Sequence, residues 1–491
     1  MNKTLRTSLF ALVAASVQSA EIWRAPTATV EEGDWNDSLT WVNGSIPGSS
    51  DTAKIDKSGS YTNSDTDLSI ARLDLYSGTV NVSSGTFAAN VTYVYGGEFN
   101  IFGSAKVTTA SAFNSGDGID GGTTPSYVHD TEARINVYGN ATVEDNTWGI
   151  LIGESALNQN VVANFYGNST ITAKNGGNGV KIGTSRTYST ESSATSVLNV
   201  YENSTVNATT LYFYRNATLN VYGEANFTAS AKAYIGDSKT DSVANMNLGG
   251  SSRTTLSSYS FVFNYANLTV KDNATLTLNQ NMRIGSDEAE VVTPGHLIFK
   301  DSAKLIQANG GLIMYGADST IELHGSNITV ADGQTWMTKC IGLTSEAEKG
   351  ITGGTLKFVA DSEGISTLVA GWVEYNDPTA QTAYAIELDF TNFNPAAGEG
   401  VYTFNIITSI NNWNGREATI MQNYLLSTDD PTSNLVKVIK AGADDTYEFF
   451  VNNGNKTFGI NYNFAAVPEP STYAAIFGAL ALAFAAYRRR K

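Results

Sequence analysis

The stretch INVYGNATV, from Ile135 to Val143, decides the fold because near copies of it recur along the chain. Other copies read NIFGSAKV, NFYGNSTI, NVYENSTV and NVYGEANF, and more degenerate ones follow. Apolar and polar residues alternate inside each copy, which is the period-2 pattern of a β-strand with one buried face. Aligning the copies on their asparagine, or on the residue that replaces it, gives these positions: Asn100, Asn136, Asn164, Asn199, Asn220, Asn247, Thr269, Ile298 and Glu322.

The spacing of the copies indicates a repeat architecture. Successive copies lie 21 to 36 residues apart, and an Ile-Gly pair follows some of them by 15 to 18 residues, at Ile152, Ile182, Ile235 and Ile284. One such unit cannot bury its apolar face alone, whereas stacked units share a continuous core. We therefore predict an all-β, right-handed parallel β-helix, in which about a dozen coils would form a solenoid roughly 60 Å long.

The alternation inside INVYGNATV assigns each residue to a face of this solenoid. Ile135, Val137, Ala141 and Val143 are expected inside, and the residues between them outside. A propeller or an antiparallel sandwich is the alternative fold. Propeller blades need a steadier period of about 40–50 residues, and a sandwich would not repeat one motif along the sequence.

Both ends of the chain lack the repeated motif. Residues 33–56, which contain Trp35 and Trp41, are expected to cap the first coil, because a bare solenoid end exposes an aggregation-prone edge. From about residue 350 to residue 464 the strands lengthen, as in YAIELDF. This segment is expected to form the final coils and a β-rich cap or small sandwich.

Composition and charge exclude several classes of protein. The chain carries 47 acidic and 30 basic residues, for a net charge of −17. Nucleic acid is therefore a poor partner, since phosphate binding needs clustered Lys and Arg. A single cysteine, Cys340, rules out intrachain disulfides and thiolate zinc sites. Cys340 is expected to be a small buried apolar residue rather than a nucleophile.

The N-terminus has the pattern of a secretory signal peptide over residues 1–20. Lys3 and Arg6 form its basic region, Leu9 to Val17 its apolar region, and VQSA its small-residue cleavage site. The C-terminus ends in VPEPSTYAAIFGALALAFAAYRRRK. Its apolar stretch, Tyr473 to Tyr487, has 15 residues, or about 22 Å of helix, which is short for a membrane span.

This tail resembles the PEP-CTERM sorting signal of envelope proteins. Pro468, Glu469 and Pro470 match its short motif, and Arg488, Arg489 and Arg490 match its basic end. The resemblance implies recognition by an exosortase-type sorting protease, transient membrane anchoring by the C-terminal helix, cleavage near Pro470, and delivery to the cell surface or an extracellular matrix. An ordinary C-terminal anchor is the alternative.

A more diffuse resemblance covers most of residues 30–465. Trp35, Trp41, Pro47 and Asp51 are similar to the opening of autotransporter-like surface proteins with β-strand repeats. The expected organisation comprises a signal peptide (1–20), an N-terminal cap (21–60), a β-helix repeat region (61–335), C-terminal β-rich coils or cap (336–466) and a PEP-CTERM signal with its helix (467–491).

Catalytic motifs are missing from the sequence, although parallel β-helices do host polysaccharide lyases and glycosidases. Such sites need clustered acids, often with an Arg or Lys base or Ca²⁺. The histidines His129, His296 and His324 are far apart in sequence and are expected at the surface or in turns. The acids are expected to be scattered, at different offsets within their coils: Asp145, Glu154, Glu202, Glu224, Asp237 and Asp272. No metal or other cofactor is expected.

One outward column invites a functional hypothesis. The position two after the aligning residue is aromatic in five successive copies, at Phe102, Tyr138, Tyr166, Tyr201 and Tyr222. Stacked in register, these rings form a ladder that either stabilises the coils or offers sugar rings a stacking strip. The Asn-x-Ser/Thr patterns in the copies, which mimic glycosylation acceptors, are better explained by turns, since Asn tolerates left-handed geometry and bonds its own backbone.

These patterns together predict an exported, non-enzymatic protein with a structural or adhesive role at the cell surface or in the extracellular matrix. Its partners would be the sorting protease, extracellular polysaccharide and, before processing, the membrane. The alternative is a secreted carbohydrate-active enzyme, a polysaccharide lyase or glycosidase, on the same scaffold. Three or more acids converging with a Lys or Arg in a groove would favour the enzyme.

Overall fold

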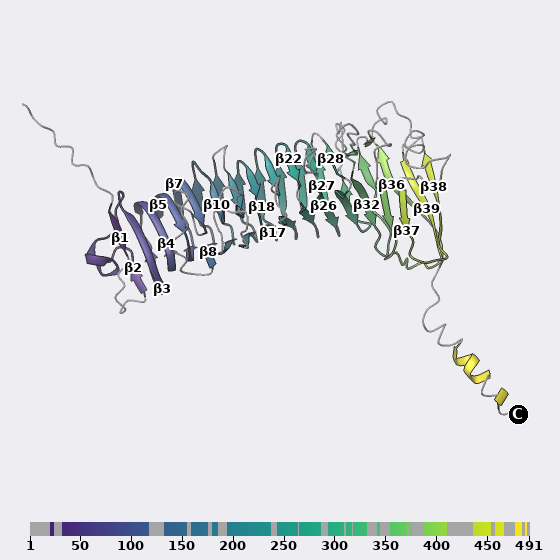
Figure 1. Ribbon diagram of the computed structural model, residues 1–491, viewed down its shortest axis with the longest axis horizontal. Helices are drawn as coiled ribbons and strands as arrows, with labels where there is room; N and C mark the ends of the chain where they lie inside the picture. The colour runs from purple at the N-terminus through teal and green to yellow at the C-terminus, as the bar shows by residue number, and fades with distance from the viewer. Residues whose placement is uncertain are drawn as a thin grey trace, which may run out of the picture.

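The computed structural model is an elongated rod of stacked β-coils (Figure 1). It describes residues 20–23, 32–116, 132–154, 159–174, 179–184, 194–236, 243–263, 265–285, 293–308, 311–316, 318–330, 341–343, 354–370, 373–375, 386–409, 436–452, 457–465, 477–483 and 487–488. Among the predicted features, residues 1–19, His129, Asp237, Cys340, Pro468, Glu469, Pro470, Arg489 and Arg490 lie outside these ranges.

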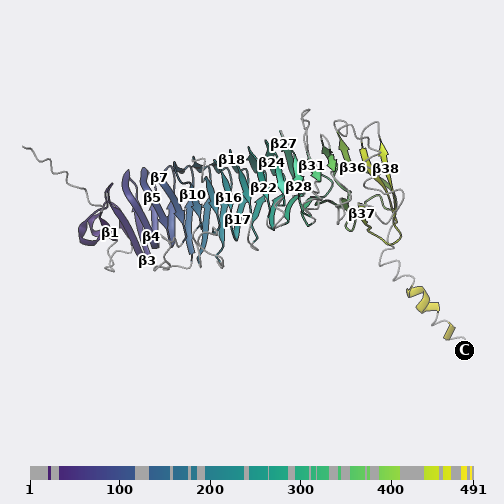
Figure 2. The ribbon, with the colours of Figure 1, turned by 45° about the horizontal axis from the view of Figure 1, so that its top comes forward.

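Three parallel rows of strands run along the rod, and most coils contribute one strand to each row (Figures 1 and 2). The first row carries the recurring motif and consists of β6 (Gly97–Ile101), β8 (Glu132–Val137), β11 (Asn160–Phe165), β14 (Ser196–Val200), β17 (Ala217–Val221), β20 (Asn245–Leu248), β23 (Ala266–Val270), β26 (Gly295–Lys300), β29 (Thr320–His324), β32 (Thr355–Val359), β35 (Ile386–Asp389) and β37 (Val436–Ile439).

The second row follows the turn after each motif. It consists of β9 (Thr142–Asp145), β12 (Thr170–Ala173), β15 (Thr205–Ala208), β18 (Asn226–Ala229), β21 (Arg253–Leu256), β24 (Thr275–Leu278), β27 (Lys304–Gln307) and β30 (Thr329–Val330). The third row carries the Ile-Gly marker and consists of β10 (Ile150–Ile152), β13 (Val180–Ile182), β16 (Leu211–Phe213), β19 (Ala233–Ile235), β22 (Ser260–Val262), β25 (Met282–Ile284), β28 (Leu312–Met314), β31 (Ile341–Leu343) and β34 (Val373–Tyr375).

Strand pairing confirms the parallel β-helix and the alignment of its copies. Asn136 pairs with Asn100 and with Asn164, and the register continues without a shift to Glu322. In the third row Ile152 pairs with Ile182. The sandwich and propeller alternatives are wrong, because neighbouring coils pair in parallel throughout the rows.

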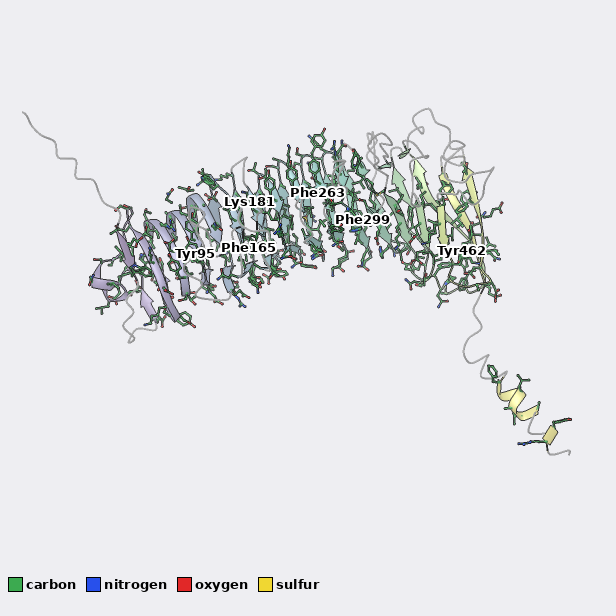
Figure 3. The ribbon with its side chains drawn as sticks, in the orientation of Figure 1. Tyr95, Phe165, Lys181, Phe263, Phe299 and Tyr462 are labelled. Carbon is green, nitrogen blue, oxygen red and sulfur yellow. The ribbon has the colours of Figure 1, made fainter. Side chains whose placement is uncertain are left out.

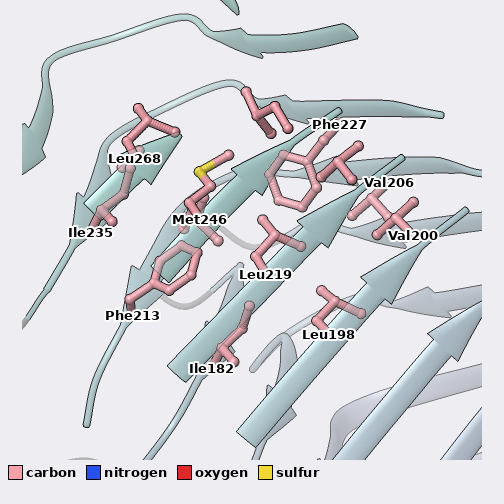
Figure 4. Packing of buried hydrophobic residues seen from close by; sticks show 14 of the residues in the cluster. Ile182, Leu198, Val200, Val206, Phe213, Leu219, Phe227, Ile235, Met246 and Leu268 are labelled. Atoms are coloured by element: carbon pink, nitrogen blue, oxygen red, sulfur yellow. The ribbon is translucent and has the colours of Figure 1, made fainter. Parts of the chain in front are cut away.

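The core is a continuous column of apolar side chains inside the coils (Figure 4). Leu198, Leu219, Met246 and Leu268 succeed one another in the first row, and each is fully buried. In the founding motif Ile135, Val137, Ala141 and Val143 are buried, as the alternation predicted. Neighbouring coils supply the burial that no single coil could, which is why the unit must repeat.

The N-terminal end is closed by two tryptophans. It contains β1 (Glu21–Trp23), β2 (Glu32–Asp34), the short 3₁₀ turns η1 (Ser38–Thr40) and η2 (Val42–Gly44), and the strands β3 (Thr52–Ser64), β4 (Leu68–Val82), β5 (Thr86–Val94) and β7 (Lys106–Ser115). Trp35 and Trp41 are buried, and the indole N–H of Trp41 donates to the Trp35 carbonyl at 2.8 Å. The ring of Trp35 packs edge-on against Phe87 of β5 at 5.6 Å, so the tryptophans cover the first apolar coil.

A four-stranded sheet follows the last coils. Its strands are β33 (Leu368–Ala370), β36 (Gly400–Ser409), β38 (Thr446–Asn452) and β39 (Thr457–Phe464), and β36 and β38 pair antiparallel to β39. Phe390, Phe393 and Tyr462 pack together beneath it. Residues 477–483 form a short helix. Within the described ranges, no helix has the length and apolar character needed to cross a membrane.

Candidate functional site

The aromatic column predicted from the sequence lies on the outside of the first row. Its rings are stacked in series: Phe102 on Tyr138 at 5.2 Å, Tyr138 on Tyr166 at 5.3 Å, Tyr166 on Tyr201 at 5.4 Å and Tyr201 on Tyr222 at 6.2 Å between ring centroids. Their planes are inclined to one another by 6° to 20°. The five residues therefore form one ladder, and each interior ring has a neighbour on both faces.

This geometry bears directly on the sugar-stacking hypothesis. The faces of Tyr138, Tyr166 and Tyr201 are occupied by adjacent rings, so a sugar ring has no free face to lie on there. Beyond Tyr222 the next coil has Gly249, and the Lys271 ammonium lies 5.5 Å from the Tyr222 ring centroid. A cation thus covers the end of the ladder. The rings stack mainly on each other and present their edges to solvent.

The aligning asparagines form a second ladder beside the aromatic one. In each coil the side-chain N–H of one asparagine donates to the side-chain oxygen of the preceding asparagine, at 2.8 to 3.1 Å. The chain of bonds runs through Asn63, Asn81, Asn100, Asn136, Asn164, Asn199, Asn220 and Asn247. The sequence alignment found six of these residues but did not predict that they bond to one another.

The turn after the motif corrects two sequence-based interpretations. The left-handed residue is Gly139 (φ 69°), and not Asn140, whose side-chain oxygen accepts from Asn168 of the next coil at 3.1 Å. Glu202 and Asp272 occupy the same left-handed position in their coils, with φ of 57° each. These two acids therefore share one offset, contrary to the prediction that the acids fall at different offsets.

Acids at this turn position have a structural use. The carboxylate of Glu202 accepts from the Gly167 amide at 2.6 Å, and that of Asp272 from the Gly250 amide at 2.8 Å. Gly167 and Gly250 hold the same position one coil earlier. A carboxylate here thus compensates for the unfavourable backbone of a non-glycine residue by bonding the preceding turn.

Two further aromatic ladders escaped the sequence analysis. Tyr212, Tyr234 and Phe261 stack in the third row at 5.1 and 4.9 Å, and the Arg283 guanidinium lies 5.8 Å from the Phe261 ring. Near the N-terminal end Trp23, Tyr76, Tyr95 and Tyr93 stack in series, at 5.1 to 6.1 Å. The residue before the Ile-Gly marker would have signalled the first of these ladders, since Tyr234 precedes Ile235.

Charged residues replace asparagine in the same outer column toward the C-terminus. Lys357 and Lys437 flank Glu387, with N–O distances of 3.3 and 2.9 Å. One coil before Lys357, Glu322 accepts from Thr320 at 3.0 Å and contacts the His324 ring nitrogen at 2.7 Å. Burial raises the pKa of Glu322, but the His324 and Thr320 contacts outweigh it and leave the pKa below its usual value.

Two of the dispersed histidines meet at this point. The Nδ1 of His296 lies 2.9 Å from the Thr320 hydroxyl, which in turn donates to Glu322, and His324 contacts Glu322 directly. Burial lowers the pKa of His296, which keeps its imidazole neutral at neutral pH. His296 and His324, distant in sequence, therefore belong to one polar cluster around Glu322.

An open groove of about 400 Å³ lies next to this cluster. The residues Lys300, Asp301, His324, Asp361 and Asn392 contribute its polar lining. Both oxygens of Asp361 are occupied by hydrogen bonds, from the amide and hydroxyl of Ser326 and from the amides of residues 363 and 364. Burial raises the pKa of Asp361, but these hydrogen bonds outweigh burial and leave the pKa below its usual value. Asp361 is therefore ionised at neutral pH.

The predicted acids Asp145 and Glu154 also have structural partners. Buried Asp145 accepts from the Thr109 hydroxyl at 2.6 Å and from the Gly149 amide. Burial raises the pKa of Asp145 despite these bonds. Glu154 forms an ion pair with Lys181 at 2.7 Å. Over the residues that the structure describes, no three His, Cys, Asp or Glu side chains gather in a way that could hold a metal ion.

No protein-family model, no curated protein and no solved structure matches this chain. Polar and aromatic side chains cover the rod along its length (Figure 3).

Proposed function

We propose that this chain is an exported structural or adhesive protein, a stiff rod displayed at the cell surface or in an extracellular polysaccharide matrix. The proposal includes sorting by the C-terminal tail, with an exosortase-type protease acting near Pro470 and the membrane as a transient anchor. Its support is the resemblance of Pro468, Glu469, Pro470 and the terminal arginines to a PEP-CTERM signal.

One observation carries the structural role. The outward positions of the first row repeat one side chain from coil to coil, and these side chains bond each other. A catalytic site needs unlike groups brought together, whereas a rod needs each coil held to the next. The asparagine and tyrosine ladders use the outward positions of the first row to hold each coil to the next.

The test is the location and mass of the chain in its own cells. Wild type is expected in the envelope, accessible to added protease, with an intact mass that lacks the residues after the Pro-Glu-Pro motif. Glu469→Ala should keep the tail and reduce surface display, while Glu448→Ala, an exposed glutamate of β38, should change neither. A surface protein that retains Arg488 and the residues after it would contradict sorting by cleavage.

A second candidate, a secreted lyase or glycosidase, is favoured by the groove, where Asp301 and Asp361 lie with Lys300. Against it, the groove has two lining acids, and both oxygens of Asp361 already accept hydrogen bonds, from Ser326 and from its own turn. Incubating the chain with polygalacturonate, xylan and mannan should release no reducing ends. Release that Asp301→Asn abolishes would establish the enzyme and overturn the structural proposal.

A further inference from the structure

The groove next to the Glu322 cluster is lined by residues from several coils. Lys300 and Asp301 approach it from the end of β26, and Asn392 from the segment after β35. Val359 adds apolar surface to the same lining, and Ala360 is buried behind it. With His324, Asp361 and Ser362, the groove thus combines one lysine, two acids, an amide, an imidazole and a hydroxyl beside a small apolar patch.

The preceding coil carries the same pair of residues at the equivalent position. Lys271-Asp272 and Lys300-Asp301 occupy equivalent positions, since β23 and β26 pair in register. Lys271 covers the Tyr222 ring, and the Asp272 carboxylate bonds the Gly250 amide. The first pair is therefore engaged in holding the coils together.

In the second pair the Asp301 carboxylate makes the bond equivalent to that of Asp272, and only Lys300 differs from its counterpart. Within the described residues the Lys300 ammonium makes no ion pair or hydrogen bond. Asp301 accepts one bond, at 3.2 Å from the Asp272 amide to its Oδ2, and its Oδ1 accepts none from the described part of the chain. Two charged groups on one turn thus face the groove with donors and an acceptor to offer.

The opposite charges decide the class of ligand. A groove lined by donors alone would select an anion, and one lined by acids alone a cation. Here the donors of Lys300 and Asn392 stand beside the acceptor of Asp301, which matches neighbouring sugar hydroxyls, because each hydroxyl both donates and accepts. The apolar surface of Val359 suits the C–H face of a pyranose.

We propose that this groove binds a sugar unit of an uncharged polysaccharide, with Lys300 and Asp301 as the residues that hold its hydroxyls. The proposal rests on the polysaccharide setting of the proposed function and names a site and a ligand class for it. A volume of about 400 Å³ lies in the range of small-ligand pockets. The aromatic ladder, whose ring faces are covered, is not needed for this binding.

The experiment compares two matched double variants of the full chain. K300Q/D301N removes both charges from the groove, and K271Q/D272N makes the same changes one coil earlier. Asparagine tolerates the left-handed backbone of Asp272 and Asp301, so both variants are expected to fold. The probes are immobilised gluco-, manno-, galacto- and xylo-oligosaccharides of two to six units, with oligogalacturonides as the acidic set.

Wild type and K271Q/D272N should retain the same neutral oligosaccharide, and K300Q/D301N should bind it at least about tenfold more weakly, as the loss of charge-assisted bonds implies. Retention of no neutral probe, retention of oligogalacturonides alone, or equal binding by K300Q/D301N would overturn the proposal. Surface display is measured separately in cells. If the protein reaches the surface but retains none of these probes, the groove proposal is wrong and the proposed function still stands.

Discussion

The outer column of the first row is built in two ways along one rod. From Asn63 to Asn247 it is a run of hydrogen-bonded amides, and from Glu322 to Lys437 it is a run of charged residues. An amide donates and accepts, so asparagine stacks on itself. A carboxylate or ammonium repels its own kind and must alternate with the opposite charge.

This difference explains why the aligning position keeps one letter in the amide run and changes its letter in the charged run. A self-complementary side chain permits the same letter in every coil, and tyrosine, which stacks on tyrosine, behaves in the same way. A charged column demands that successive letters differ, as Lys357, Glu387 and Lys437 do. The β-helix continues through both regions, although the repeated sequence motif is no longer recognisable in the second.

The largest expected effect tests whether the core is the same in both regions. Phe227 of β18 and Phe358 of β32 are both fully buried. Phe227→Ala and Phe358→Ala should each lower the free energy of unfolding by about 3–5 kcal/mol through lost burial and a cavity. Urea unfolding followed by circular dichroism measures this loss.

The control for the core variants is Thr228→Ala, an outward change next to Phe227 that is expected to stay within about 0.5 kcal/mol. A Phe358→Ala cost far below that of Phe227→Ala would mean that the two regions differ in their packing and not only in their outer column.

A smaller effect is expected from breaking the amide ladder. Asn164→Ala removes the bonds to Asn136 and from Asn199, both 2.8 Å long, and leaves part-buried amide groups without partners. The cost should be about 1–3 kcal/mol. Asn168→Ala in the same coil also removes two amide bonds, of 3.1 and 3.3 Å, but at exposed positions where water replaces them. Equal losses for the two variants would show that burial does not set the strength of the ladder.

The charged column should respond less, and in a salt-dependent way. Glu387→Gln removes the ion pairs with Lys357 and Lys437, whose side chains are 29% and 41% exposed. Partly exposed pairs contribute about 1 kcal/mol or less, and 1 M salt should erase most of it. The loss caused by Asn164→Ala should be unchanged in the same salt. A Glu387→Gln effect that persists in 1 M salt would contradict the electrostatic account.

The sequence predicted the parts of the molecule that repeat with a constant offset. The alternation in INVYGNATV placed Ile135 and Val137 inside, and the alignment held as far as Glu322. It did not predict the amide ladder, because that depends on the distance between coils and not on the pattern within one. The groove could not be predicted from the sequence for a related reason. Lys300 and Asn392 lie on different coils, and the loops between coils vary in length.

A change of pH should separate the two regions with the smallest effect. The acids Glu322, Asp361 and Asp445 of the C-terminal part have pKa values held below normal. For each of them burial acts in the opposite direction but is outweighed, for Asp445 by the Tyr462 hydroxyl and the Ala465 and Gly442 amides. Groups of this kind stabilise the fold above their unfolded pKa of about 4, and the contribution is lost as the pH falls through the folded value.

Asp145 in the middle coils has the opposite sign, because burial raises its pKa. Its folded form binds the proton more tightly, so its contribution to stability is greatest below about pH 4 and is lost as the pH rises. Hydrogen exchange resolved by peptide, corrected for the intrinsic pH dependence of exchange, should therefore show the C-terminal sheet losing protection as the pH falls below about 4, while the coils around β9 keep theirs. Asp145→Asn should remove the pH dependence that Asp145 gives to protection at β9. The loss of protection in the C-terminal sheet should be unchanged. Uniform loss along the rod would mean that the coils and the sheet unfold as one unit.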